Sequence, residues 1–304
     1  MTAVTRAPSK ALRAWRALVR GDERAWRWAG TSAAFSLLVG ALLYVLWPML
    51  EDFTTYGFHD WDAATAYRYI TVVSLKHGEG PWWQPYLCGG IPAWGHVEAA
   101  SNLVSPYLPL YLLSDVRTAI RLEVLGQGLT ALVGTYLFAG CFSRSVALRA
   151  LLAALFVLNG RWALQAAVGH TWHLQYGLMP WAFYCFERSQ APGKLRWAVG
   201  AGAVMALECF WGGIYPLPHT ALLLGGYAVL TALFGAKLRP LAALAITASV
   251  AFGLSAPKLF AVVDRMSDAP RLIESNEVIG LAELVVMLTA PDQRYGVHSV
   301  RVPA

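Results

Sequence analysis

The chain has 304 residues, of which 57% are hydrophobic and only 14% are charged, whereas soluble domains average about 45–50% and about 25%. An apolar excess of this size, with a mean hydropathy of +0.47, cannot be buried in one water-soluble core, and this excludes an ordinary soluble enzyme. The formal charge of +6 does not indicate a nucleic-acid partner, because Lys and Arg in a membrane protein report its orientation first.

Apolar runs long enough to cross a bilayer recur along the chain. A bilayer core of about 30 Å needs roughly 20 apolar residues per helix. Seven runs lie near Ala29–Leu50, Thr118–Cys141, Val146–Ala167, Trp172–Phe186, Trp197–Tyr215, His219–Ala236 and Pro240–Val262. The first run follows a basic stretch without a signal-peptide cleavage site after it, which predicts an uncleaved anchor. The predicted fold class is therefore all-α: a polytopic integral membrane protein with about seven transmembrane helices and a large, structured first outer loop.

The placement of Lys and Arg predicts which side each connection faces, because short cytoplasmic loops retain these residues. The N-terminal tail and the second, fourth and sixth connections carry them, whereas residues 169–171 and 216–218 carry none. This alternation predicts a basic cytoplasmic tail over residues 1–28. It further predicts a transmembrane module over 29–263 that includes an outer loop at 51–117, and an outer loop with the chain end at 264–304.

Polar residues within the predicted helices lie toward their outer ends, although a charge at a helix centre costs about 2.5–3.5 kcal/mol. The intramembrane set is Arg121, Glu123, Gln127, Asn159, Arg161, Gln165, Gln175, Glu208 and Lys258. The loops on the same side add His59, Asp60, Asp62, His96, Glu98, His170, His173 and His219. Together these residues predict an outward-facing polar cavity. The alternative is that each side chain extends to the headgroups or pairs with a neighbouring helix.

The first outer loop contains His59-Asp60-Trp61-Asp62 directly after the first apolar run. Two carboxylates at positions i and i+2 can hold a divalent cation such as Mg²⁺ or Mn²⁺, or one can act as a general base. The alternative is that Asp62 only caps a helix predicted over residues 63–76, while Asp60 is solvated. Residues 103–113 are apolar but too short to span, which predicts an interfacial or re-entrant piece.

Several motifs together resemble a known family. They are Asp60-Trp-Asp62, the stretch PWWQPYLCGG from Pro81 to Gly90, Gly169-His170, Pro180-Trp181, Ala256-Pro-Lys-Leu259 and Pro270-Arg271. In order and spacing they resemble bacterial multi-pass proteins of the YfhO type, within the GT-C superfamily of membrane glycosyltransferases. Gln84 departs from the pattern, in which Asn is usual. Members are usually longer, so this chain looks like the N-terminal seven-helix module alone or a truncated product.

The resemblance implies a polyprenyl-phosphate-linked sugar as donor, an unidentified cell-envelope acceptor, and a site on the outer face of the bacterial cytoplasmic membrane. It also implies an acidic base in the first loop, sometimes with a metal, and Asp60 and Asp62 match that position. Cationic groups then hold the lipid phosphate, and the residues present suggest Lys258, Arg161 and Arg121, with His170 and His59 as further contacts. The second tier of the predicted cavity is Glu98, Glu123, Glu208, His96 and Arg271.

Three other functions fit parts of the sequence. A transporter would use an outer vestibule, but it should also have polar groups in the cytoplasmic halves of its helices. A metal or haem protein could be built on His170, His173 and His219. A non-catalytic assembly partner or remnant would suit a short chain.

Overall fold

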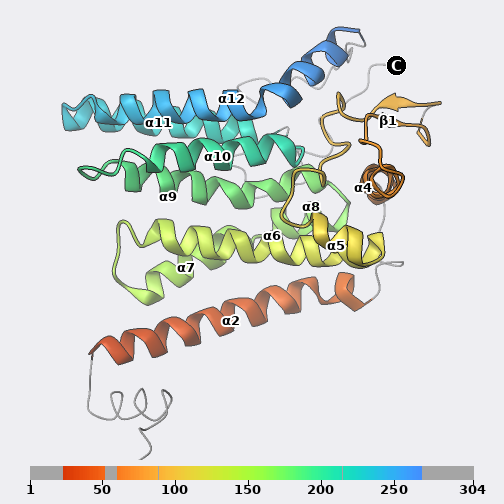
Figure 1. The fold of residues 1–304 in the computed structure, drawn as a ribbon. Coiled ribbons are helices and arrows are strands. Elements are labelled where there is room, and N and C mark those ends of the chain that lie inside the picture. The colour runs from red at the N-terminus through yellow and green to blue at the C-terminus, as the bar shows by residue number, and fades with distance from the viewer. Residues whose placement is uncertain (1–22, 52–59, 88, 214, 269–304) are drawn as a thin grey trace, which may run out of the picture. The chain divides into compact units, whose positions relative to one another are not determined.

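The computed structural model describes residues 23–51, 60–87, 89–213 and 215–268, and these residues are mostly helical (Figure 1). The helices outside the long loop between α2 and α6 are α2 (Glu23–Glu51), α6 (Val116–Ala139), α7 (Val146–Val157), α8 (Gly160–Ala167), the 3-10 helix η1 (Thr171–Leu178), α9 (Met179–Ser189), α10 (Trp197–Phe210), α11 (Pro216–Gly235) and α12 (Arg239–Asp268). That loop, called the outer loop here after its predicted side, contains α4 (Trp61–Lys76), β1 (Trp83–Gln84), β2 (Ile91–Pro92) and α5 (Leu108–Leu113). The two strands pair antiparallel.

Within the described residues, five helical segments are long and apolar enough to cross a membrane. They are Trp28–Glu51, Val116–Ala139, Val146–Ala167, Pro216–Gly235 and Arg239–Asp268. The prediction of an all-α, membrane-embedded protein is therefore confirmed. The other two predicted spans are shorter helices: α10 has 14 residues, and the fourth segment is η1 followed by the 11 residues of α9.

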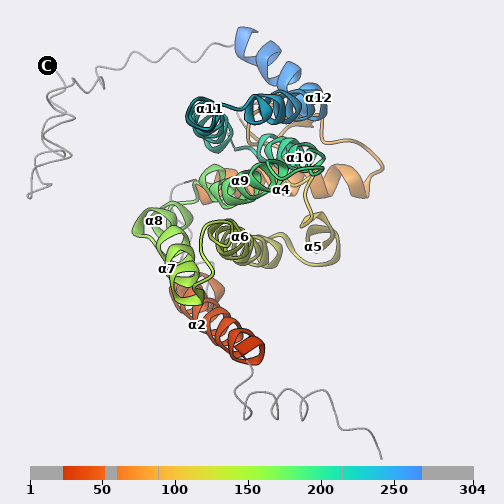
Figure 2. The same cartoon turned by 90° about the vertical axis from the view of Figure 1, so that its left-hand side faces the viewer.

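The long helices lie side by side (Figures 1 and 2), although not in strict chain order, since α6 contacts both α2 and α9. Helix α6 contacts α2, α7, η1 and α9, and α9 contacts α10, which in turn contacts α11. One apolar core, which includes Leu42, Ile120 and Val157, joins α2, α6 and α7. Outward-facing apolar side chains such as Phe234 and Phe252 are 88% and 56% exposed, as expected for surfaces in contact with lipid.

The third apolar segment is interrupted within the predicted span. Helix α7 ends at Val157, and Asn159 begins α8 by accepting a hydrogen bond on its side chain from the backbone N–H of Trp162, at 2.9 Å. Asn is among the best N-cap residues, and Gly160 follows it. One helix was expected over Val146–Ala167, and this cap explains why two consecutive helices form instead. The N-terminus of α8 therefore lies inside the apolar segment.

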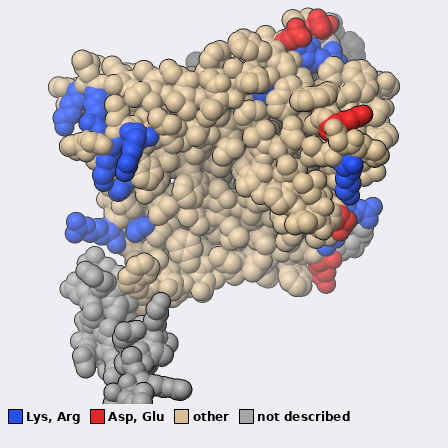
Figure 3. All heavy atoms as spheres, in the orientation of Figure 1, with Lys and Arg blue, Asp and Glu red and all other residues tan. Residues whose placement is uncertain are grey.

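Charge is distributed unevenly between the two ends of the helices. In the view of Figure 3, one end carries only Lys and Arg, and every visible Asp and Glu lies at the other end. The basic end is formed by the connections after α6, α9 and α11, which contain Arg144, Lys194, Arg196 and Lys237. The outer-loop elements α4, β1 and α5 lie at the opposite end (Figure 1).

Helix α4 confirms the helix predicted over residues 63–76, but it begins earlier than expected. Asp60, not Asp62, is its N-cap residue, and no side-chain cap bond forms. Asp62 lies in the first turn, where its carboxylate favours the positive end of the helix dipole. Of the apolar stretch 103–113, only Leu108–Leu113 is helical: Pro106 restricts the backbone before this helix, and Pro109 lies in its first turn, where Pro is tolerated.

Candidate functional site

Asp60 and His170 meet where the start of α4 approaches the connection between α8 and η1. His170 Nε2 lies 3.2 Å from Asp60 Oδ2, and both side chains are partly exposed, at 33% and 47%. The backbone fixes Asp60 locally, since its N–H donates to the carbonyl oxygen of Val168 at 3.1 Å. The next residue, Trp61, is buried and donates its indole N–H to the carbonyl of Ala166. Two residues that the sequence placed in one cavity are therefore in contact.

Gly169 is required for this contact. Its φ of +81° lies in the left-handed region, which L side chains rarely adopt. A Cβ at this position would meet the backbone nitrogen of Trp61 and lie 2.8 Å from the carbonyl carbon of Asp60. The absence of a side chain thus allows the connection before η1 to approach the start of α4.

The second ring nitrogen of His170 also has a partner. Nδ1 contacts the side-chain amide of Gln165 on α8, and the imidazole stacks on Trp172 with ring centroids 4.6 Å apart. The side-chain oxygen of Gln165 faces Nδ1 and can only accept, so Nδ1–H is the donor in this contact, while Nε2 faces the carboxylate of Asp60. Asp60, His170 and Gln165 therefore form a continuous polar chain from α4 to α8.

Gln165 also lines a polar pocket of about 170 Å³ next to this chain. The pocket is lined by Phe156, Asn159, Arg161, Trp162, Gln165, His173 and Tyr176. The guanidinium of Arg161 lies 5.7 Å from the ring centroid of Tyr176, and Arg161 is exposed. A cation beside the N-terminus of α8, in a partly apolar pocket, provides a suitable environment for an anionic group.

An apolar groove adjoins the polar pocket, because Phe156 lines both. The groove has a volume of about 420 Å³ and is bounded by α6, α7, α9 and α11 through Thr135, Phe138, Ala139, Phe142, Leu152, Phe156, Met179, Pro180, Phe183 and Leu223. It extends from the break between α7 and α8 toward the basic end of the helices, where Phe142 follows α6. The polar pocket and the apolar groove therefore lie next to each other, on the two sides of Phe156.

Lys258 occupies a different environment from Arg161. It is 1% exposed, and its ammonium group donates to the carbonyl oxygens of Trp94, His96 and Ala99 at 2.8, 2.7 and 3.1 Å. An ammonium group has three N–H donors, so these three bonds use all of them. The structure thus gives Lys258 the role of joining the outer loop to α12 and brings it no partner from the polar pocket.

The remaining candidates lie in several places. Arg121 donates to the carbonyl of Leu50 at 3.0 Å, while Glu208 is buried and accepts from Thr220 at 3.0 Å. His96 accepts from the backbone N–H groups of Glu98 and Ala99. Burial, together with the nearby charges of Lys258 and Arg265, lowers the pKa of His96 to about 4.

Two candidates, His59 and Arg271, lie outside the described residues. Asp62 is exposed. No group of three or more His, Cys, Asp or Glu residues that could hold a metal ion occurs in the described part of the chain. Mg²⁺ or Mn²⁺ at Asp60 and Asp62 stays a prediction, and any such ion would need ligands from water or substrate.

Of the three histidines considered for haem, His219 contacts the hydroxyl of Tyr176, and the rings of His170 and His173 are 6.1 Å apart.

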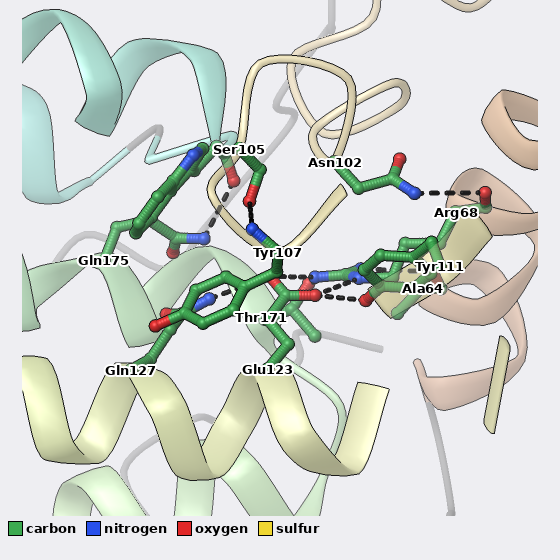
Figure 4. Close-up of polar contacts among 11 residues, drawn as sticks. Ala64, Arg68, Asn102, Ser105, Tyr107, Tyr111, Glu123, Gln127, Thr171 and Gln175 are labelled. Carbon is green, nitrogen blue, oxygen red and sulfur yellow. Dashed lines mark hydrogen bonds and ion pairs between the residues drawn. The ribbon is translucent and has the colours of Figure 1, made fainter. Parts of the chain in front are cut away.

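A buried ion pair that was not predicted from the sequence lies next to the site. Arg68 Nε on α4 donates to Glu123 Oε2 on α6 at 2.9 Å, and Tyr111 on α5 donates its hydroxyl to the same carboxylate (Figure 4). Burial alone lowers the pKa of Arg68, but the charge of Glu123 outweighs it and raises the pKa above its usual value. A signal was available, because Arg68 is the one basic residue within an otherwise uncharged stretch from Ala63 to Leu75.

Comparisons with known proteins add no identification, since no family, curated protein or solved structure matches the chain.

Proposed function

We propose that the chain is a membrane enzyme that transfers a sugar from a polyprenyl-phosphate-linked donor to a cell-envelope acceptor on the outer face of the bacterial cytoplasmic membrane. The observation that carries the proposal is the polar pocket with Arg161, which adjoins the apolar groove at Phe156 and is linked to Asp60 through Gln165 and His170. A donor of this class has a matching sequence of parts: sugar, phosphate and long apolar chain.

The proposed topology has seven crossings, with the N-terminus in the cytoplasm. It counts the five long segments together with α10 and the segment of η1 and α9. The gathering of Lys and Arg at one end of the helices supports this orientation. The site formed by Asp60 and Arg161 then faces outward.

In the proposed reaction, Asp60 accepts the proton of the acceptor hydroxyl while the acceptor oxygen attacks the anomeric carbon of the sugar. The bond between that carbon and the phosphate oxygen breaks, and the polyprenyl phosphate leaves with its negative charge. Arg161 stabilises that charge as it develops. His170, held by Gln165, orients the carboxylate of Asp60.

The test uses the purified full chain in nanodiscs with radiolabelled polyprenyl-phosphate sugars and a cell-envelope extract as acceptor. We expect Asp60→Asn to reduce transfer by about 100-fold or more while donor binding is kept. We expect Arg161→Gln to weaken donor binding. Glu79→Gln and Arg117→Gln are matched controls, because these residues are exposed on the outer side and lie outside the pocket.

Unchanged transfer in Asp60→Asn would rule out this base, and equal donor binding by Arg161→Gln and Arg117→Gln would rule out this phosphate site. Asp62→Asn, measured in parallel, decides whether the second aspartate of the triplet contributes. The alternatives, a transporter or an assembly partner, predict no transfer by the wild-type chain with any donor.

A further inference from the structure

One guanidinium, that of Arg68, connects three elements beneath the site (Figure 4). Nε and Nη2 donate to the two carboxylate oxygens of Glu123 on α6, at 2.9 and 3.4 Å. Nη1 donates to the carbonyl of Ala64 on α4 itself, at 3.1 Å, and to the hydroxyl of Thr171 in η1, at 3.4 Å. The planar fork of Arg makes these contacts at once, which the point charge of a Lys cannot do.

The ion pair is fully enclosed by polar partners. The side chains of Arg68 and Glu123 are 2% and 6% exposed, and the carboxylate also accepts from Tyr111 and from Gln127 at 2.9 Å. Asn102 donates to the backbone carbonyl of Arg68 at 3.3 Å. Replacing a buried ion pair by apolar residues of similar volume is often neutral for stability, so stability alone is a poor reason for this arrangement.

The position of the pair relative to the site gives a better reason. Arg68 lies on the helix that begins directly after Asp60, and Thr171 directly follows His170. The same guanidinium therefore holds the element that carries Asp60 and the element that carries His170. Glu123, on a membrane-spanning helix, fixes the guanidinium in turn.

We propose that the Arg68–Glu123 pair is a positioning device that sets α4 against η1, and thereby sets the contact between Asp60 and His170. Its effect on catalysis rests on the proposed function, whereas its effect on geometry does not. Because small misplacements of reacting groups cost large factors in rate, loosening the pair lowers the rate of the chemical step and leaves donor binding intact.

Two variants separate positioning from folding. Arg68→Lys keeps the charge opposite Glu123 but loses the fork. The double variant Arg68→Met with Glu123→Leu removes both charges and keeps an apolar volume. Arg239→Lys is the matched control, since Arg239 also donates to backbone carbonyls, at Ser189 and Ala191, at the opposite end of the helices.

Pulsed electron spin resonance measures the distance between α4 and α8 in the full chain in nanodiscs. The four native cysteines are replaced, and spin labels are attached at Lys76→Cys and Leu164→Cys. Both residues are exposed, and neither lies in the proposed site. Lys76 is at the end of α4 farthest from Asp60, about 24 Å along the helix, so a tilt of α4 moves it most. The second readout is the kcat and KM of sugar transfer without labels.

We expect wild type and Arg239→Lys to give one narrow distance distribution. Arg68→Lys and the folded double variant should give a broadened or shifted one, with kcat lowered about tenfold or more and donor KM within about twofold. Wild-type distances in either folded Arg68 variant would overturn the proposal. Failure of both variants to fold would also overturn it, because the pair would then serve folding itself.

The two proposals can fail separately. If the wild-type chain transfers no sugar but the Arg68 variants lose the narrow distribution, the proposed function is wrong and the positioning device stands. If wild type transfers sugar and the Arg68 variants keep both distance and kcat, the positioning proposal is wrong and the function stands.

Discussion

At the scale of single residues, the same side-chain type has different roles because its burial differs. Arg161 is exposed at the polar pocket, whereas Arg68 is buried and bonded to Glu123 and Thr171. The ammonium group of Lys258 donates three hydrogen bonds, all of them to backbone carbonyl oxygens. Of the three, Arg161 is the one exposed at a pocket, so an incoming anion can reach its guanidinium.

The first prediction concerns Gly169, where a side chain is excluded by both conformation and space. Gly169→Ala adds a left-handed strain of about 1–2 kcal/mol and forces apart the backbone near Asp60. We expect total destabilisation above about 3 kcal/mol and loss of sugar transfer. Chemical unfolding in detergent measures the stability.

Gly193→Ala is the control for this prediction, since Gly193 also has a positive φ, of +71°, but nothing lies within 4 Å of an added Cβ. It should cost only the conformational part, about 1–2 kcal/mol. Equal destabilisation by the two changes would contradict the close approach between Gly169 and the start of α4.

At the scale of elements, the outer loop is joined to α12 over residues 94–99. Trp94 donates its indole N–H to the carbonyl of Pro257, and Lys258 donates to three loop carbonyls. Gly95 allows the approach, because a Cβ there would lie 2.9 Å from the carbonyl oxygen of Ala261. The loop therefore has a defined position on the last long helix.

The second prediction is that acid weakens this contact through His96. Its pKa in the folded state, about 4, lies below the ordinary value of 6.5, so between these values the unfolded chain binds a proton that the folded chain does not. Stability is therefore fully present above about pH 6.5 and falls as the pH drops toward 4. The unfolding midpoint between pH 7 and pH 4.5 measures this loss.

His96→Asn keeps an acceptor near the position of Nδ1 but cannot be protonated, so its unfolding midpoint should depend less on pH. His77→Asn, at an exposed histidine, should keep the wild-type dependence. Identical pH profiles for wild type and His96→Asn would show that His96 is not the responsible group.

At the scale of the whole molecule, the two ends of the helices differ in charge, and the outer-loop elements lie at the end where the acidic residues are visible (Figures 1 and 3). Cytoplasmic loops retain Lys and Arg, so this asymmetry predicts one orientation in the membrane. In that orientation, Lys76 on α4 faces the outside and Lys194 after α9 faces the cytoplasm.

The third prediction follows from this orientation and is tested on cysteine-free protein in intact cells. Lys76→Cys should react with a membrane-impermeant maleimide, and Lys194→Cys should react only after the cells are opened. Lys76 is exposed and Lys194 is partly exposed, and each serves as the control for the other. The reverse pattern would place Asp60 in the cytoplasm and remove the basis of the proposed reaction.

The sequence by itself determined the membrane-embedded, helical character of this protein, the bounds of its long helices to within a few residues, and the uneven distribution of polar groups. These properties depend on local hydrophobicity and composition, which are independent of how the helices pack. The break at Asn159 was missed because it depends on a single capping residue, and α4 begins two residues earlier than predicted without a side-chain cap bond.

Only the tertiary structure decided which polar residues meet. From the sequence, Lys258 was predicted to bind phosphate, and no role was predicted for Arg68. In the structure, Lys258 donates to carbonyls of the outer loop, and Arg68 pairs with Glu123, which is 55 residues away. The sequence shows that polar groups lie within apolar segments and therefore need hydrogen-bond or ion-pair partners inside the protein. The identity of each partner depends on which helices pack against one another, and only the folded chain determines this.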